Sequence, residues 1–180
     1  MTNTKEKLLE AKYFLERMTE KQSDRDAFKY NLSAFLAAAR SVTLIMQKEF
    51  DKAPGFKKWY SEKQAKMQSD EVMKLLNDKR VMTIHQQPVR PHVHVNVGIS
   101  EHIVISESIS IVITHANGTI ERRESKPTPP PPPAETEATT EWRWYFDELP
   151  GKDVITLCQE QIVKLETLVT ECESRFTSLG

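Results

Sequence analysis

The stretch QQPVRPHVHVNV, residues 86–97, decides the fold because the spacing of apolar residues changes within it. Before this stretch, apolar side chains recur every three or four residues, which indicates helices. From residue 92, valine alternates with a polar residue, which indicates a strand. Pro88 and Pro91 stop the preceding helix. The sequence therefore predicts helices that give way to strands at residue 92.

Three helical regions are predicted before this boundary. Residues 4–21 have an amphipathic pattern, and a long helix runs from a capping box at Ser23 and Asp26 to about Asp51. A third region follows the helix-breaking APG at 53–55 and is kinked near residues 69–70. The apolar stripe of the long helix consists of Phe28, Leu32, Phe35, Ala39, Val42, Met46 and Phe50.

Residues 92–125 are predicted to form a small antiparallel sheet of three or four strands. Within them, SISIVITHANGTIERR at 108–123 predicts two strands around an Asn117–Gly118 turn. The following KPTPPPPPAETEATTE, residues 126–141, favours a flexible proline-rich loop. The loop is interpreted as a connector, and the alternative is a proline-rich ligand for a partner.

A last helix is predicted from about residue 152. Its apolar positions alternate at spacings of three and four, which is typical of a helix-packing seam. The seam consists of Ile155, Cys158, Ile162, Leu165, Val169, Cys172 and Phe176. Since this seam needs apolar partners from the earlier helices, we expect a mainly α single domain over residues 1–180, a four-helix bundle with a β insertion at 92–125.

Composition limits the classes of function. Lys and Arg number 25 and Asp and Glu 26, giving a net charge of −1, so binding to nucleic acid through overall positive charge is not expected. The N-terminus has no apolar run of signal-peptide or membrane-span length, which favours a soluble cytoplasmic protein without a membrane partner. Cys158 and Cys172 lie about 21 Å apart on one predicted helix, which indicates buried free thiols.

Arg80 and His85 are the candidate catalytic residues. A histidine can exchange a proton with a ribose 2′-hydroxyl or with the leaving oxygen, and an arginine can hold the phosphate oxygens. On an ideal helix the two side chains diverge by about 140°, so we expect either a helix end at His85 or a second subunit to complete the site. The alternative is that both residues only stabilise the helix C-terminus.

The segment RVMTIH, residues 80–85, at the end of a helix in a predicted four-helix bundle resembles the Arg-x4-His motif of the HEPN family. In that family the arginine is usually followed by a polar residue, whereas Val81 follows it here. The resemblance implies a metal-independent endoribonuclease or RNA-binding protein, often a toxin or defence component. It also implies a homodimer and, for a toxin, an antitoxin partner.

Further cations are candidates for binding RNA. Lys79 and Arg90 belong to a stretch, residues 79–94, that contains three histidines and no acid, and this predicts a local anion-binding patch. Arg40 interrupts an alanine-rich helix and is interpreted as lying at the edge of the apolar stripe, or alternatively as a buried cation near the site.

Other motifs have a structural and a functional interpretation. His92 and His94 share a strand face, but no third metal ligand has a fitting spacing, so solvent-facing histidines are favoured. The aromatic run EWRWYF, residues 141–146, is interpreted as core packing, and the alternative is stacking on bases. No metal or cofactor motif was found in the sequence. A noncatalytic helical protein-interaction module is the alternative to an RNA-cleaving protein.

Overall fold

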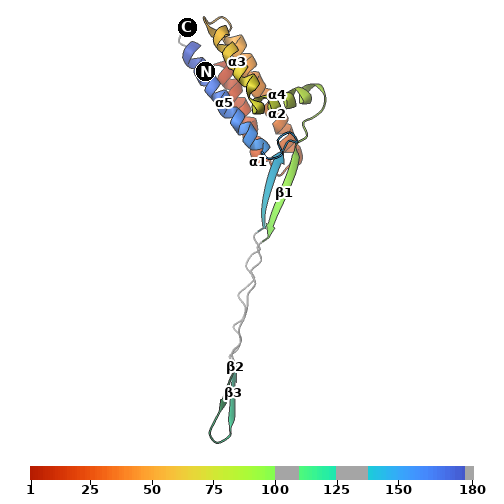
Figure 1. Ribbon diagram of the computed structural model, residues 1–180, viewed down its shortest axis with the longest axis vertical. Coiled ribbons are helices and arrows are strands. Elements are labelled where there is room, and N and C mark those ends of the chain that lie inside the picture. The colour runs from red at the N-terminus through yellow and green to blue at the C-terminus, as the bar shows by residue number, and fades with distance from the viewer. Residues whose placement is uncertain (100–109, 125–137, 177–180) are drawn as a thin grey trace. The chain divides into compact units, whose positions relative to one another are not determined.

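The computed structural model describes residues 1–99, 110–124 and 138–176. The described residues form five helices and four strands, which confirms a mainly helical protein with small sheets (Figure 1). The helices are α1 (Asn3–Glu20), α2 (Arg25–Phe50), α3 (Phe56–Ser69), α4 (Glu71–His85) and α5 (Val154–Phe176); the strands are β1 (His92–Ile99), β2 (Ser110–Thr114), β3 (Ile120–Glu124) and β4 (Ala138–Tyr145). The chain divides into a helical unit, Met1–Val95 with Trp142–Gly180, and a β unit, Asn96–Glu141.

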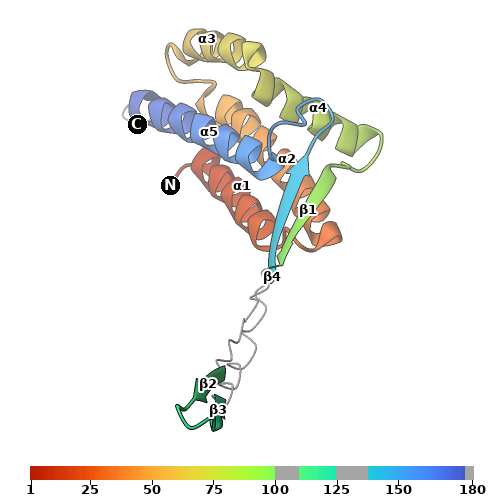
Figure 2. The same cartoon turned by 60° about the horizontal axis from the view of Figure 1, so that its bottom comes forward.

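The helical unit buries the apolar stripes that the sequence predicts. All seven stripe residues of α2 are buried, and six of the seven seam residues of α5 are buried, while Phe176 packs partly buried against them. Helix α1 lies against both α2 and α5 (Figures 1 and 2). The Thr2 hydroxyl donates to Glu173 at 2.5 Å, so the start of α1 lies beside the end of α5.

Local capping residues mark where α2 and α3 begin. Asp24, not the predicted Ser23 with Asp26, caps α2 by accepting hydrogen bonds from the amides of Asp26 and Ala27. Gly55 has a φ of 81° and precedes α3, as expected of the APG break.

The predicted third helical region is two helices, because Asp70 leaves the helical conformation and accepts a hydrogen bond from the Met73 amide at the start of α4. Figure 2 shows α3 and α4 as successive segments with a change of direction between them. The described residues of the helical unit therefore form five helices where four principal ones were expected.

Trp144 joins the segment after the β unit to the helices. Its ring stacks on Phe28 with 4.1 Å between centroids, and its indole N–H donates to the carbonyl of Gln22 at 2.9 Å. The backbone amide of Trp144 donates to Oδ2 of Asp153. The Oδ1 atom of Asp153 accepts from the amide of Ile155, so Asp153 caps α5. Trp144 and Phe146 are buried, which confirms core packing for these two residues, whereas Trp142 and Tyr145 are only half-buried.

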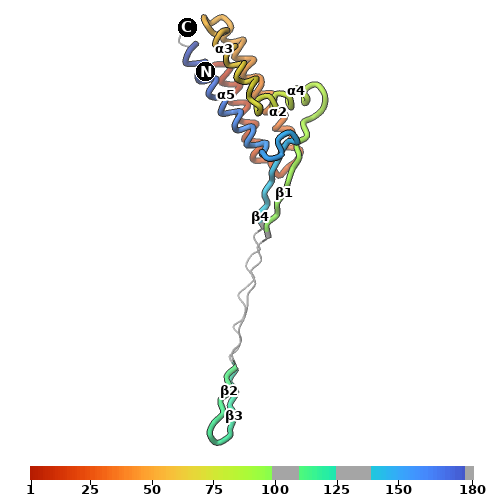
Figure 3. The backbone as a smooth tube through the Cα atoms, viewed as in Figure 1, coloured from red at the N-terminus to blue at the C-terminus, as the bar shows by residue number. Residues whose placement is uncertain are grey.

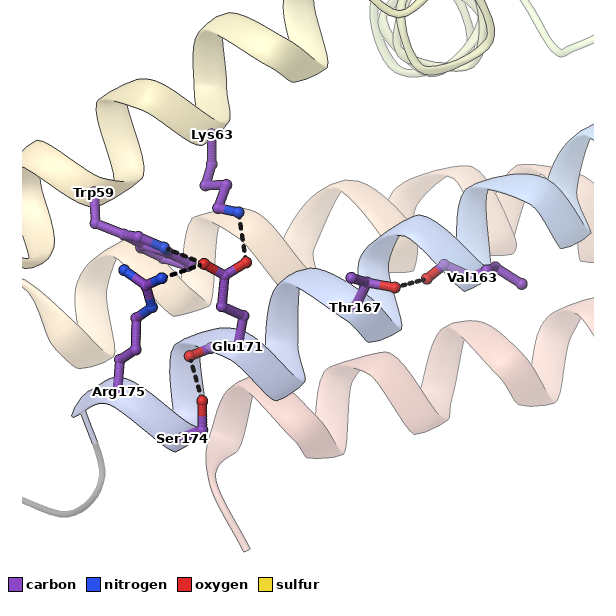
Figure 4. A network of polar contacts seen from close by, with 7 residues as sticks. All are labelled: Trp59, Lys63, Val163, Thr167, Glu171, Ser174 and Arg175. Atoms are coloured by element: carbon purple, nitrogen blue, oxygen red, sulfur yellow. Dashed lines mark hydrogen bonds and ion pairs between the residues drawn. The ribbon is translucent and has the colours of Figure 1, made fainter.

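A polar network connects α3 to α5 (Figure 4). One oxygen of Glu171 accepts the Trp59 indole N–H at 2.9 Å and pairs with Arg175 at 3.1 Å, and the other accepts from Lys63 at 2.5 Å. The hydrogen bond from Lys63 is the largest cause, followed by that from Trp59, of a lowered pKa for Glu171. The network stabilises the ionised carboxylate.

The β unit contains the predicted hairpin. Strands β2 and β3 pair antiparallel, with Val112 opposite Arg122, and residues 115–119 connect them (Figure 3). Gly118 has a φ of 81°, and Asn117 accepts a hydrogen bond from the amide of Thr119, which confirms the turn at this dipeptide.

Strands β1 and β4 form a second two-stranded sheet, so the described strands make two pairs where one sheet of three or four strands was expected. The boundary between the helical unit and the β unit falls within β1 and again within β4. Most of the proline-rich segment predicted as a loop, up to residue 137, lies outside the described residues, and residues 138–141 begin β4.

Replacing Trp144 with alanine should lower the free energy of unfolding by about 3–5 kcal/mol, because the change leaves a cavity beside Phe28. Trp144→Phe should lose less, about 1–3 kcal/mol, since a ring remains but the Gln22 carbonyl loses its donor. Urea unfolding followed by circular dichroism measures both changes. Trp142→Ala is the control: this tryptophan is half-buried, and a loss equal to that of Trp144→Ala would contradict the assigned role.

Glu171→Gln should reduce stability by about 1 kcal/mol or more at pH 7, where the native carboxylate is ionised and paired. The pKa of Glu171 is lowered from 4.5 in the folded chain, so its contribution is fully present above pH 4.5 and is lost as the pH falls through the folded pKa. The difference in the free energy of unfolding between wild type and variant should therefore become smaller in acid. Urea unfolding between pH 3 and pH 7 tests this, with the exposed Glu62→Gln as control; an equal difference at every pH would exclude the mechanism.

Candidate functional site

Arg80 and His85 lie on one continuous helix. The helical conformation of α4 extends through His85, so their side chains leave the axis about 140° apart, and one chain does not bring them together. Arg80 is half-buried and its Nε atom is buried without a hydrogen-bond partner, whereas His85 is exposed. The helix ends at His85, and the amides of Gln86 and Gln87 donate to the carbonyl of Met82.

The Lys79 side chain interacts with other residues of the fold. Its side chain is only 13% exposed, its ammonium pairs with Glu148 at 2.7 Å, and it lies 4.8 Å from the centre of the Phe146 ring. The hydrogen bond from Lys79 is the largest cause of a lowered pKa for Glu148. Arg90 is exposed between α4 and β1. These two cations and Arg80 therefore have different surroundings.

The histidines of β1 contact an aromatic ring and one carboxylate. Both His92 and His94 stack on Tyr145, with centroid distances of 5.5 and 5.1 Å, and His92 lies 3.2 Å from Asp147. Over the described residues, no three His, Cys, Asp or Glu side chains are grouped closely enough to hold a metal ion. Within the same ranges, no helix combines the length and apolar character needed to cross a bilayer.

The two cysteines are buried free thiols, as predicted. Burial, and secondarily the charge of Asp153, raises the pKa of Cys158 well above its ordinary value. Burial, followed by nearby carboxylates, raises the pKa of Cys172 to about 12. Both thiols stay protonated near neutral pH, so neither is an activated nucleophile.

A cavity of about 330 Å³ lies between α2, α3, α4 and α5. We call it the four-helix cavity. Apolar side chains from all four helices line much of it, namely Leu36, Ala39, Met67, Met73, Leu76 and Leu165. A cavity of this size between the helices of a bundle is in the range of small-molecule sites.

Polar side chains line the remainder of the four-helix cavity. Arg40 lines it and donates to the Thr43 hydroxyl at 2.5 Å, and Lys74 supplies a second cation. Tyr60 and Gln161 also line it and are both buried. Among the candidate residues from the sequence, only Arg40 lines this cavity; Lys79, Arg80, His85 and Arg90 do not.

One residue of this cavity has a spacing in the sequence that indicates burial. Gln161 is three residues after Cys158 and four before Leu165, so it occupies the buried side of the last helix, where the neighbouring positions are apolar. Tyr60 and Lys74 carried no such signal, because their stretches show only weak apolar periodicity.

Comparison with family models corrects the HEPN resemblance. The family model described as bacteriophage lambda protein ea47 matches residues 2–128, which is more than half of the chain. The HEPN assignment was wrong because it depended on a six-residue motif, and the ribonuclease, toxin and defence functions that it implied are left without support. Neither the curated proteins nor the solved structures contain a match to the chain. The chain belongs to the bacteriophage lambda ea47 family.

Proposed function

We propose that this protein is a noncatalytic protein-interaction module that associates with a second copy of itself through strand β2. The observation that carries the proposal is the uncharged, exposed β2 strand, in which Ile111 is 54% and Val112 is 52% exposed. In the described part of the chain, β2 pairs only with β3. A strand of a second copy would pair with the other edge of β2.

The two strands of the hairpin differ in charge. Strand β2, SIVIT, has no charged residue, whereas four of the five residues of β3 are charged, in the order Glu121, Arg122, Arg123 and Glu124. Charged side chains on an edge strand oppose pairing with other chains, and apolar uncharged edges favour it. The difference supports β2 as the strand that pairs and β3 as the protected outer edge.

The sequence of β2 suits pairing with itself. In an antiparallel arrangement around a twofold axis at Val112, each Val112 faces its symmetry mate, Ile111 faces Ile113, and Ser110 faces Thr114. No charge is opposed to another, and the isoleucines of both copies share one face. Because a lone two-stranded hairpin is marginally stable in water, a four-stranded sheet would also stabilise the hairpin itself.

The surroundings of the former catalytic candidates support a role without catalysis. Arg80 and His85 diverge on α4, and Lys79 is paired with Glu148. Binding through a strand edge requires none of these groups.

Val112→Lys should weaken the dimer at least about tenfold, because it places two ammonium groups opposite each other at the twofold axis. Light scattering over a concentration series measures the change: we expect wild type to approach twice 20.8 kDa at micromolar concentration and the variant to remain near 20.8 kDa.

The matched control is Ile120→Lys, which adds the same charge to an exposed isoleucine on the outer strand β3. This variant should dimerise like wild type. A monomeric wild type at micromolar concentration, or equal weakening by the two substitutions, would contradict pairing through β2.

A further inference from the structure

The four-helix cavity contains positive charge without a compensating acid. Its lining includes Arg40 and Lys74 but no aspartate or glutamate, and within the described residues neither cation forms an ion pair. The smaller cavity between α3, α4 and α5 differs, since its lining includes two acids, Glu171 paired with Lys63 and Asp70 paired with Lys164, beside the further cation Lys66. The unpaired cations of the larger cavity are suited to an anionic ligand.

The guanidinium of Arg40 is held in place. Its Nη1 donates to the Thr43 hydroxyl, and that hydroxyl donates to the Arg40 carbonyl at 3.0 Å. Thr43 is buried, so the pair restrains the arginine at the cavity wall. The remaining guanidinium N–H groups can then donate to a ligand.

A buried hydroxyl adds a second donor. The Tyr60 oxygen accepts a hydrogen bond from Gln47 at 3.0 Å, and Gln47 also donates to the Thr43 carbonyl. Because a phenol both accepts and donates, the Tyr60 hydroxyl proton remains available at the cavity.

Gln161 supplies an independent observation. Its side chain lines the cavity, the residue is only 7% exposed, and its Oε1 atom is buried without a hydrogen-bond partner. A buried carbonyl oxygen without a donor destabilises a fold. An N–H or O–H group of a bound molecule would satisfy it.

We infer that the four-helix cavity binds a small organic anion that has an apolar body, one carboxylate and a hydrogen-bond donor. The carboxylate lies toward Arg40 and Tyr60, the donor reaches Gln161, and the apolar body contacts side chains such as Leu36 and Leu165. This site belongs to the helical unit, and the inference is independent of dimerisation through β2.

Indole-3-propionate is the probe for this inference, because it combines an apolar ring, an N–H donor and a carboxylate. Titration of the full chain by calorimetry should give saturable binding to one site per chain. Indole-3-propionamide, which lacks the charge, and 1-methylindole-3-propionate, which lacks the donor, should each bind about tenfold more weakly. Absence of binding, or equal affinity for all three compounds, would overturn the inference.

Variants locate the binding within the cavity. Arg40→Gln should weaken binding of indole-3-propionate about tenfold and reduce its preference over the amide, and Tyr60→Phe should weaken it less. Arg25→Gln, an exposed arginine on the same helix, should leave affinity unchanged and is the matched control. Equal effects of the two arginine substitutions would place the carboxylate elsewhere.

Gln161→Leu separates a ligand-binding role from a structural one. Removing a carbonyl oxygen that has no partner should leave the melting temperature of the unliganded chain unchanged or higher. The same change should remove the preference for indole-3-propionate over its 1-methyl analogue. A variant that melts lower and keeps the preference would show that Gln161 only supports the fold.

Discussion

The helical unit depends on the burial of Trp144. This side chain stacks on Phe28 at the start of α2 and donates to the carbonyl of Gln22 between α1 and α2. The backbone amide of Trp144 donates to the carboxylate of Asp153. Asp153 in turn caps α5, so Trp144 connects the end of β4 with α2, with the turn between α1 and α2, and with the start of α5. Because the N-terminal helices precede the strands and α5 follows them, this connection allows the two parts of one core to meet across a long stretch of sequence.

Much of the helical core follows from the sequence because apolar spacing reports directly which side of a helix is buried. The stripes of α2 and α5 illustrate this, since nearly all of their predicted residues are buried. The position of the break at Asp70 was predicted as a kink near residues 69–70, but the sequence did not indicate that one capping aspartate would end one helix and begin another. Strand β4 was assigned partly to a proline-rich loop, since ATTEWRWY pairs with β1 through its backbone and has no clean alternation.

The candidate site was predicted less well because a site depends on which side chains meet, and short spacing does not determine that. Lys79 and Arg80 are neighbours in sequence, yet the first pairs with Glu148 and the second has a buried Nε atom without a partner. Arg40 was selected as a cation within an apolar helix, and it does line a cavity. Its companions there, Tyr60 and Gln161, come from other helices, so no local motif connects the three.

Two buried or partly buried polar groups of the helical unit, those of Glu171 and Gln161, differ in their contribution to the free energy of unfolding. Glu171 is stabilised within the fold, because its carboxylate has cationic and N–H partners that offset its removal from water. Within the described residues the Oε1 of Gln161 has no such partner, and an unpartnered buried oxygen costs about 1–3 kcal/mol, a substantial part of the stability of a small domain. Leucine would fill a similar volume without this cost. The destabilising carbonyl therefore makes sense if a bound molecule supplies its partner, and the unpaired Arg40 at the same cavity indicates that this molecule is an anion.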